Sequence, residues 1–381
     1  MSVVKKLEKA FMFANYTPAD KSIGITKKIG SEIDALRRMG MRVTYTAYDG
    51  DGVSIFDDSD HVIYHKAFPT PWAKINRKIR YFWLEKTAVE YLGSVEGFDL
   101  GYIRIGAPNG ALFQIFRLLK GKGARIVAES LAYFPGIQYK SLFGKYIVLM
   151  YRLNDRRFKD YLDYFLVEGN LTELHGVEAV PMNMGVEVDK IHPHQYMGES
   201  EALHLISVAN ENVYHGYDRI IKSLNTYLEQ AEDKRVYVHL VGTVSDETKE
   251  LVKRYGLEDH VFLYGKKSGA ELDEIYNKCN VGLGPFGQHR VGGKKDTGLK
   301  TKEYFAKGLP YIYSGSEPTV PEGYPYICAF ASDESLIDFE KVRSFYNSYR
   351  DDPMVVERMR TFAGEHYSWD TIMRGALSHL E

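Results

Sequence analysis

The sequence predicts an α/β protein made of two doubly wound domains of the same architecture. Short apolar segments typical of buried strands alternate with segments of helical periodicity along most of the chain. The turn-rich segment PHQYMGES, residues 193–200, interrupts this alternation near the middle, and the alternation then starts again. The 381 residues are enough for two separate cores. We expect the two domains to face each other across a cleft, which is a favoured place for ligands.

The first half begins as a parallel α/β unit. Residues 10–16 are apolar and strand-like, residues 25–38 have helical periodicity, and residues 41–47 form the next strand. The loop TPADKSIG, residues 17–24, joins the first strand to the helix, at the edge where open parallel sheets bind ligands. Gly24 ends this loop and is therefore a candidate for close approach of the backbone to a ligand.

The alternation continues through the first half, after an acidic, turn-rich segment at residues 51–60. The expected strands are residues 100–105, 124–129, 163–167 and 179–182, and the expected helices are residues 74–92 and 111–120. Arg104 and Glu129 stand at the carboxyl ends of two strands, so both are candidate site residues. Glu129 would position an acceptor, balance a cation or cap a helix, and the sequence leaves these roles open.

Basic residues are concentrated in the first half. Residues 61–160 contain 17 Lys and Arg against 7 Asp and Glu. The helix expected at residues 74–92 has an apolar stripe made of Ile75, Ile79, Phe82 and Trp83. Its other face is basic and carries Arg77, Lys78 and Arg80. Two interpretations have equal support: a solvated surface, or a patch that faces an anionic membrane or a lipid diphosphate. The net charge is −2 and no recognition motif accompanies the patch, so nucleic acid is not an expected partner.

The second half repeats the alternation of strands and helices. The expected strands are residues 203–208, 236–241, 261–263 and 281–283, and the expected helices are residues 217–230, 245–255 and 269–278. Three terminal helices are expected at residues 335–345, 352–363 and 367–380. This series has the size of a second doubly wound domain.

The stretch GLGPFGQHRVGGKKDTGLKTKEYFAKGLPYIYS, residues 282–314, is the most informative part of the second half. It predicts a strand end, a glycine-rich loop, a helix over residues 299–307, a tight turn and a buried strand. Gly308 suits the left-handed position after a helix, and Pro310 prevents the helix from continuing. Gly284 lies in the loop after a strand, where the backbone must approach a ligand closely.

Charged residues in this stretch indicate an anion site. The loop contributes Arg290, Lys294 and Lys295, and the free N–H groups at a helix start favour a phosphate beside them. Lys300 and Glu303 are three residues apart, so they share one face of the helix. A cation and a carboxylate placed in this way would hold a diphosphate and a sugar hydroxyl. The alternative is a solvated ion pair on a surface helix.

The cysteines and the apolar segments argue against a disulfide-rich, metal-binding, secreted or membrane-spanning protein. Cys279 and Cys328 make no disulfide framework, and no CxxC or His-rich spacing predicts a metal site. The N-terminal residues are too polar for a signal peptide, and no apolar run has the length of a membrane span. We expect a cytoplasmic protein, either free or at the inner face of the membrane.

Six segments in order resemble the GT-B retaining glycosyltransferases of family 4, which make bacterial polysaccharides and glycoconjugates. They are PMNMGVEVDKIHP (181–193), ISVANENVYHGYDRIIKSL (206–224), VYVHLVG (236–242), HVFLYGKKSGAELDEIYNKCNVGLGPF (260–286), LKTKEYFAKGLPYI (299–312) and HYSWDTI (366–372). The resemblance implies two Rossmann-like domains that face each other across a cleft. Residues 1–195 would bind the acceptor, residues 196–365 the nucleotide-sugar, and a helix at residues 366–381 would cross back to the first domain.

The resemblance also assigns roles to residues. Glu303 corresponds to the second glutamate of the family's E-x7-E pattern, so it would accept hydrogen bonds from the ribose. Lys295 stands where the first glutamate is expected, His215 replaces a lysine before Gly216, and Ala209 replaces an arginine. Something must still stabilise the leaving diphosphate.

Replacements for these missing groups can be named from the sequence. Arg290 and Lys300 are the best replacement cations, with help from His215. Thr301, beside Lys300, is a further donor-binding candidate. Glu129 is a candidate catalytic residue in the first half.

The implied activity is transfer of a sugar from a nucleotide-sugar to a glycan or lipid-linked acceptor, with retention of configuration. The implied mechanism needs no metal or other cofactor, and the leaving phosphate takes the acceptor's proton. Two alternatives remain: a catalytically silent GT-B module that steadies a partner transferase, and a nucleotide-sugar 2-epimerase.

Overall fold

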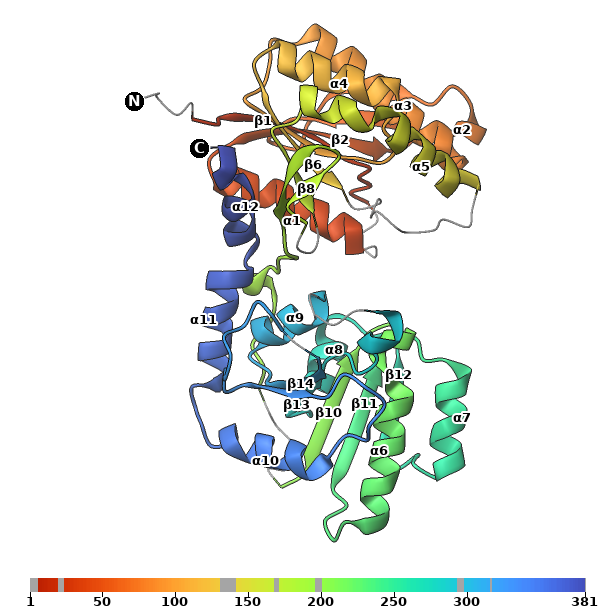
Figure 1. The fold of residues 1–381 in the computed structure, drawn as a ribbon, viewed down its shortest axis with the longest axis vertical. Coiled ribbons are helices and arrows are strands. Elements are labelled where there is room, and N and C mark those ends of the chain that lie inside the picture. The colour runs from red at the N-terminus through yellow and green to blue at the C-terminus, as the bar shows by residue number, and fades with distance from the viewer. Residues whose placement is uncertain are drawn as a thin grey trace. The chain divides into compact units, whose positions relative to one another are not determined.

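The computed structural model describes residues 6–19, 24–130, 142–167, 171–195, 201–292, 298–315 and 317–380. The chain divides into two compact units, each with its own sheet (Figure 1). Unit 1 is Met1–Asn183 together with Trp369–Glu381, and unit 2 is Met184–Ser368. The C-terminal helix therefore belongs to the first unit by its contacts. The predicted fold class, with two parallel α/β sheets, is confirmed.

The sheet of unit 1 has nine strands in the order β4-β3-β2-β1-β5-β6-β7-β9-β8. The strands are β1 Lys9–Phe13, β2 Arg42–Asp49, β3 Gly52–Phe56, β4 Val62–Ala67, β5 Leu100–Arg104, β6 Arg125–Ser130, β7 Tyr164–Val167, β8 Glu173–Leu174 and β9 Val177–Pro181. The central strands β2, β1, β5, β6, β7 and β9 are parallel, whereas β3, β4 and β8 are antiparallel to their neighbours.

The segment at residues 51–60, expected to be rich in turns, has turns at both ends but also contains the strand β3, which was not predicted. It pairs antiparallel with β2, so that Phe56 is opposite Tyr45 and Gly52 is opposite Asp49. The buried, β-branched residues Val53 and Ile55 favour the strand. The aspartates that suggested a turn lie in the short connections on either side of it.

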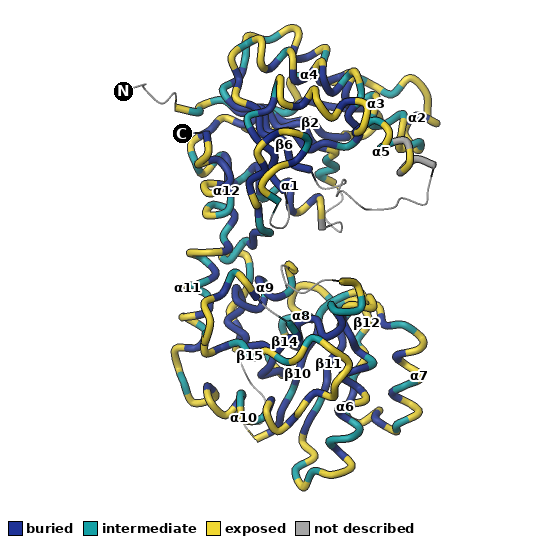
Figure 2. Tube along the Cα trace, viewed as in Figure 1, coloured by how far each residue is buried: buried dark blue, intermediate teal, exposed yellow. Residues whose placement is uncertain are grey.

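Helices cover both faces of this sheet (Figure 1). They are α1 Gly24–Arg38, α2 Pro71–Ile75, α3 Arg77–Ser94, α4 Gly110–Gly121, α5 Leu142–Asn154, α12 Trp369–Leu377 and the 3₁₀ helices η1 Asp155–Asp160 and η5 Ser378–Leu380. One apolar cluster joins the sheet to α3 and α4, and a second joins it to α1 and α12. The central strands β1, β5, β6 and β7 are deeply buried (Figure 2).

The helix predicted at residues 74–92 is two helices, and its predicted apolar stripe is wrong. Asn76 ends α2 and begins α3, where its side chain accepts hydrogen bonds from the backbone N–H groups of residues 78 and 79. This break interrupts the helical period. Ile75 is 79% exposed and Phe82 is 53% exposed, and the buried face of α3 is instead formed by residues that include Leu84 and Ala88.

Glu85, on the buried face of α3, gives a pH-dependent contribution to stability. Burial is the main cause that raises its pKa to about 8, although Asn109 donates hydrogen bonds to both of its carboxylate oxygens. Between about pH 4.5 and 8 the unfolded chain loses this proton and the folded chain keeps it, so stability falls as pH rises. We expect Glu85→Gln to raise the free energy of unfolding by about 3 kcal/mol at pH 7 and by little at pH 4.5. Denaturation at both pH values measures this, and an equal effect at both would contradict it.

The sheet of unit 2 has six parallel strands in the order β12-β11-β10-β13-β14-β15. The strands are β10 Leu203–Val208, β11 Val236–Val241, β12 Val261–Gly265, β13 Val281–Leu283, β14 Tyr311–Ser314 and β15 Ile327–Phe330. In chain order this is the 3-2-1-4-5-6 arrangement of the Rossmann fold. The winding direction reverses between β10 and β13, which are neighbours in the sheet.

One apolar cluster joins this sheet to its helices. They are α6 Tyr217–Gln230, α7 Asp246–Tyr255, α8 Gly269–Tyr276, α9 Leu299–Lys307, α10 Phe339–Tyr349, α11 Val355–Tyr367 and the 3₁₀ helices η2 Val188–Lys190, η3 Val213–His215 and η4 Gln288–Val291. The helix predicted over residues 299–307 is confirmed as α9, and Gly308 caps it in the left-handed conformation with φ 77°. None of the helices in the described residues has both the length and the apolar character to cross a bilayer.

Candidate functional site

The candidate site lies in unit 2, at the carboxyl ends of β10 and β13. In an open parallel sheet the ligand crevice forms where the winding direction reverses, and the loops after these two strands lie at this point. Backbone hydrogen bonds join the two loops: Phe286 N donates to His215 O at 3.1 Å, and Gly287 N donates to Tyr214 O at 2.9 Å. The predicted residues His215, Gly284 and Arg290 are therefore brought to one end of the sheet.

Glycines allow these two loops to come so close. Gly216 has a φ of 66°, and a Cβ on it would lie 2.8 Å from the carbonyl carbon of Phe286. Gly284 allows close packing within the sheet. A Cβ on Gly284 would lie 2.7 Å from the Cβ of Tyr313, so this glycine lets β13 pack against β14.

Lys300 lies in the first turn of α9 and reaches the end of β10. Its Nζ donates a hydrogen bond to Ser207 Oγ at 3.2 Å, and Ser207 Oγ is 2.8 Å from the hydroxyl of Tyr217. Glu303 is half-buried one turn later, on the same helix face as Lys300. A cation and a carboxylate thus stand side by side at the start of α9, where the helix dipole also favours an anion.

The surroundings of His215 disfavour the positive charge that a replacement cation would need. His215 is buried, and its Nδ1 accepts a hydrogen bond from Asn212 N at 3.0 Å. Burial and, to a smaller extent, the nearby Lys300 lower its pKa to about 3. The ring proton is therefore on Nε2, and His215 can donate a hydrogen bond to a ligand but brings no positive charge.

Arg290 has a structural role that the sequence did not predict. Its Nη1 and Nη2 donate to Asp218 at 2.6 and 3.1 Å, and its Nε and Nη2 donate to Glu334 at 2.7 and 2.6 Å. These two carboxylates hold η4 against the start of α6. A phosphate at Arg290 would have to share the guanidinium with them.

The other predicted residues of this region are placed as follows. Thr301 is buried, and its Oγ1 donates to Gly298 O at 3.1 Å, so it fastens the first turn of α9. Gly24 is the first residue of α1, in unit 1. Lys294 and Lys295 lie outside the described residues.

Glu129 belongs to a buried group of four charges in unit 1. It is the penultimate residue of β6 and forms ion pairs with Lys28 and with Arg104, whose Nη1 is 3.0 Å from Glu129 Oε2. Glu32 of α1 completes the group, 3.1 Å from Lys28 Nζ and 2.9 Å from Arg104 Nη1. Of the three roles considered for Glu129, the structure supports the balancing of cations.

Arg219 of α6 is a positioning residue that the sequence reasoning missed. It is buried and donates hydrogen bonds to the carbonyl oxygens of Phe286, Ala331 and Ser335 and to Ser314 Oγ. It therefore ties together the segments that follow β13, β14 and β15. An arginine among the apolar positions of residues 217–224 is the signal that could have identified it.

Comparisons with known proteins agree with this geometry. Residues 196–322 match the model of the family "Glycosyl transferases group 1". The chain is similar to the crystal structure of a glycosyltransferase from Rickettsia africae ESF-5, with a TM-score of 0.63, 12% identity and 99% and 98% of the two chains covered. No curated protein matches its sequence.

Two further solved structures have the same fold. The catalytic domain of starch synthase IV from Arabidopsis thaliana, bound to ADP and acarbose, has a TM-score of 0.63, 13% identity and 99% of both chains covered. Sucrose-phosphate synthase from Thermosynechococcus elongatus has a TM-score of 0.60, 14% identity and 97% and 98% coverage. These similarities show that the chain has the GT-B fold. The segment that matches the group 1 glycosyltransferase model lies within the residue range of unit 2.

Proposed function

We propose that this protein transfers a sugar from a nucleoside diphosphate sugar to a glycan or lipid-linked acceptor, with retention of configuration. The observation that carries this proposal is the pair Lys300 and Glu303 at the start of α9, beside the reversal point of a Rossmann sheet. Glu303 would accept hydrogen bonds from the ribose, and Lys300 would face the diphosphate. The bond between the anomeric carbon and the diphosphate oxygen breaks, the acceptor oxygen bonds to that carbon, and the acceptor's proton leaves with the diphosphate.

A thermal-shift screen with UDP-, GDP-, ADP- and dTDP-sugars tests the donor site. A donor at about one hundred times its dissociation constant should stabilise the protein by about 2.7 kcal/mol. We expect Glu303→Ala to weaken the binding of that donor by about tenfold or more, because the ribose loses a charged acceptor. Glu271→Ala, an exposed glutamate on α8, is the matched control.

The products separate the remaining activities. Release of the free nucleotide together with a glycosylated acceptor supports the transferase, whereas an epimerised nucleotide-sugar would identify a 2-epimerase. If no donor shifts the melting temperature and Glu303→Ala changes nothing, the proposal is wrong and a silent partner module becomes the better explanation.

We further propose that unit 1 meets an anionic membrane through α2 and the start of α3. Trp72 is 62% exposed, and Ile75 and Phe82 are also largely exposed. Lys74 and Arg77 are exposed between them. Apolar side chains among cations on a short amphipathic surface favour the interface of an anionic bilayer.

Sedimentation with vesicles tests this surface. We expect binding to vesicles that contain phosphatidylglycerol, weaker binding to pure phosphatidylcholine, and a loss of about tenfold or more for the double variant Trp72→Ser, Ile75→Ser. Leu336→Ser removes a comparably exposed apolar side chain from unit 2 and serves as the control. If the double variant binds these vesicles as tightly as Leu336→Ser does, the proposal is contradicted.

A further inference from the structure

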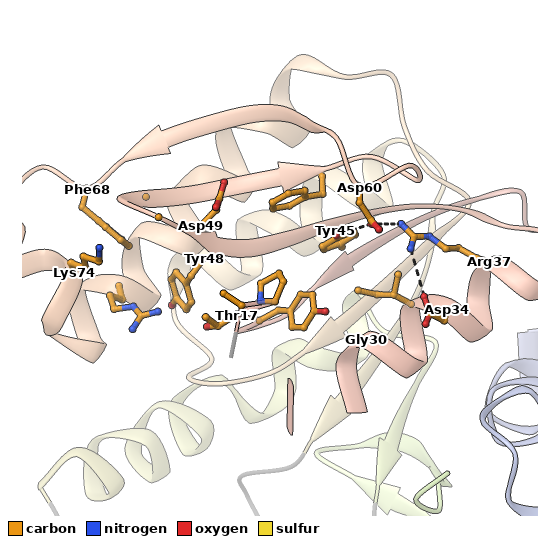
Figure 3. A pocket seen from close by; sticks show the side chains of 18 residues that line it. Thr17, Gly30, Asp34, Arg37, Tyr45, Tyr48, Asp49, Asp60, Phe68 and Lys74 are labelled. Carbon is orange, nitrogen blue, oxygen red and sulfur yellow. Dashed lines mark hydrogen bonds and ion pairs between the residues drawn. The ribbon is translucent and has the colours of Figure 1, made fainter. Parts of the chain in front are cut away.

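Unit 1 contains a pocket of about 730 Å³ at the carboxyl ends of β1 and β2 (Figure 3). All its lining residues lie between Tyr16 and Arg80, so unit 1 forms the pocket by itself. Its volume is typical of ligand sites in proteins. None of the residues predicted from the resemblance lines this pocket.

Aromatic rings form much of the pocket wall. Tyr45 and Phe56 are stacked with their centroids 5.2 Å apart, and Tyr16 meets Tyr45 edge-on at 5.8 Å. Tyr48 and Phe68 lie farther along the pocket, with centroids 6.4 Å apart. Tyr45 and Tyr48 are only 5% and 8% exposed, so the half-buried Tyr16, Phe56 and Phe68 present most of the aromatic surface. Such a surface suits a ligand that has both C–H groups and hydroxyls, as a sugar ring does.

One end of the pocket is rich in carboxylates. Arg37 pairs there with Asp60 at 2.6 Å and with Asp34 at 3.7 Å, as the dashed lines in Figure 3 show. Tyr45 also donates its hydroxyl hydrogen to Asp60 at 2.9 Å. Three carboxylates surround this guanidinium, because Asp58 also pairs with it at 3.3 Å, and Asp34 and Asp60 line the pocket. Carboxylate oxygens are suitable acceptors for the hydroxyl groups of a neutral ring.

The opposite end carries cations. Figure 3 places Lys74 there, away from Asp34 and Arg37. The guanidinium of Arg80 lies 4.0 Å above the ring of Tyr48, and its Nε is buried without a hydrogen-bond partner in the described part of the chain. Within the same part, neither Lys74 nor Arg80 forms an ion pair with a carboxylate. These cations are therefore available to an anionic group of a ligand.

We propose that this pocket binds a saccharide that carries an anionic group, with its rings against the aromatic wall of Tyr16, Phe56 and Phe68 and its anion on Lys74 and Arg80. The inference rests on the proposed function, because this saccharide would be the acceptor. Lys74 lies on α2 between the exposed Trp72 and Ile75, so the cationic end adjoins the surface proposed to meet a membrane. The anion is a phosphate if the saccharide is lipid-linked, or a carboxylate if it is a sugar acid.

Saturation-transfer NMR on the full chain tests the pocket with three probes: glucose 1-phosphate, glucuronic acid and glucose. We expect both anionic probes to bind about tenfold more tightly than glucose. Lys74→Gln and Arg80→Gln should each remove most of this preference, and Phe56→Ala should weaken all three probes. A preference for the phosphate over the carboxylate would favour a lipid-linked ligand, and the reverse would favour a sugar acid. Arg117→Gln, exposed on α4, is the matched control.

Equal binding of glucose and the anionic probes, or binding that none of the pocket variants changes, would overturn the inference. Lys74 is exposed, so Lys74→Gln should fold normally and keeps the test valid if Arg80→Gln does not fold. The thermal shift with nucleotide-sugars is measured on the same proteins. Normal donor binding without saccharide binding would overturn the pocket alone, whereas saccharide binding without any donor shift would overturn the proposed function alone.

Discussion

Replacing Lys300 with alanine is expected to lower kcat by about a hundredfold to a thousandfold, the usual effect of removing one group that stabilises developing negative charge. Lys300 stands at the start of α9, where the N-terminal end of the helix adds its own positive potential. Negative charge grows on the diphosphate as the glycosidic bond breaks, so a fixed cation there acts mainly on the transition state. The affinity for the donor should fall much less than kcat.

Steady-state kinetics with the donor found in the thermal-shift screen measures this effect. Lys300→Arg should recover part of the activity, because a guanidinium also carries the charge but fits the Ser207 contact differently. Lys266→Ala removes an exposed lysine after β12 and should leave kcat unchanged. A Lys300→Ala enzyme with nearly normal kcat would remove Lys300 from the mechanism.

His215 gives this prediction a second readout. Lys300 is the second cause, after burial, of the low pKa of His215. Without the lysine charge, that pKa should rise from about 3 toward its ordinary value, although burial keeps it low. A titration of His215 by NMR in Lys300→Ala would detect the shift, and no shift would show that the two side chains do not interact.

The secondary structure of unit 2 could be predicted well from the sequence, because its signals are local. The helix α9 begins after Gly298 and ends at Gly308, and residues 281–283 form β13, as expected. Each boundary depends on a cap, a proline or an apolar run of a few neighbouring residues. The break at Asn76 and the strands β3, β4 and β15 were missed, although their signals are also local.

The partners of the charged residues could not be predicted, because they depend on sheet order and distant segments. Lys300 and Lys302 are neighbours in one helix turn, yet Lys300 reaches β10 whereas Lys302 is buried and paired with Glu317 at 3.1 Å. Arg290 meets two carboxylates from far along the chain, Asp218 and Glu334. A lysine or arginine in the sequence shows that a cation is present, but the tertiary structure decides whether a ligand can use it.

Replacing Arg104 with methionine is expected to lower the free energy of unfolding by about 3 to 5 kcal/mol. The substitution leaves one more buried negative charge than positive charge in the group of Lys28, Glu32 and Glu129. Two cations and two carboxylates now balance one another, and without Arg104 only Lys28 faces Glu32 and Glu129. Burial and the Glu129 charge already raise the pKa of Glu32 against the effect of both cations. Losing one cation should raise that pKa further, so the loss should be larger at pH 8 than at pH 5.

Urea denaturation followed by circular dichroism at the two pH values measures this loss, and a second substitution identifies its cause. Adding Glu32→Gln to Arg104→Met restores neutrality with Lys28 and Glu129, so more than half of the lost stability should return. Arg125→Met breaks the half-exposed ion pair with Asp163 on the same sheet and should cost less than about 1 kcal/mol. Charge balance does not stabilise this end of the sheet if Arg104→Met lowers the free energy of unfolding no more than Arg125→Met does. The same conclusion follows if adding Glu32→Gln fails to restore the lost stability.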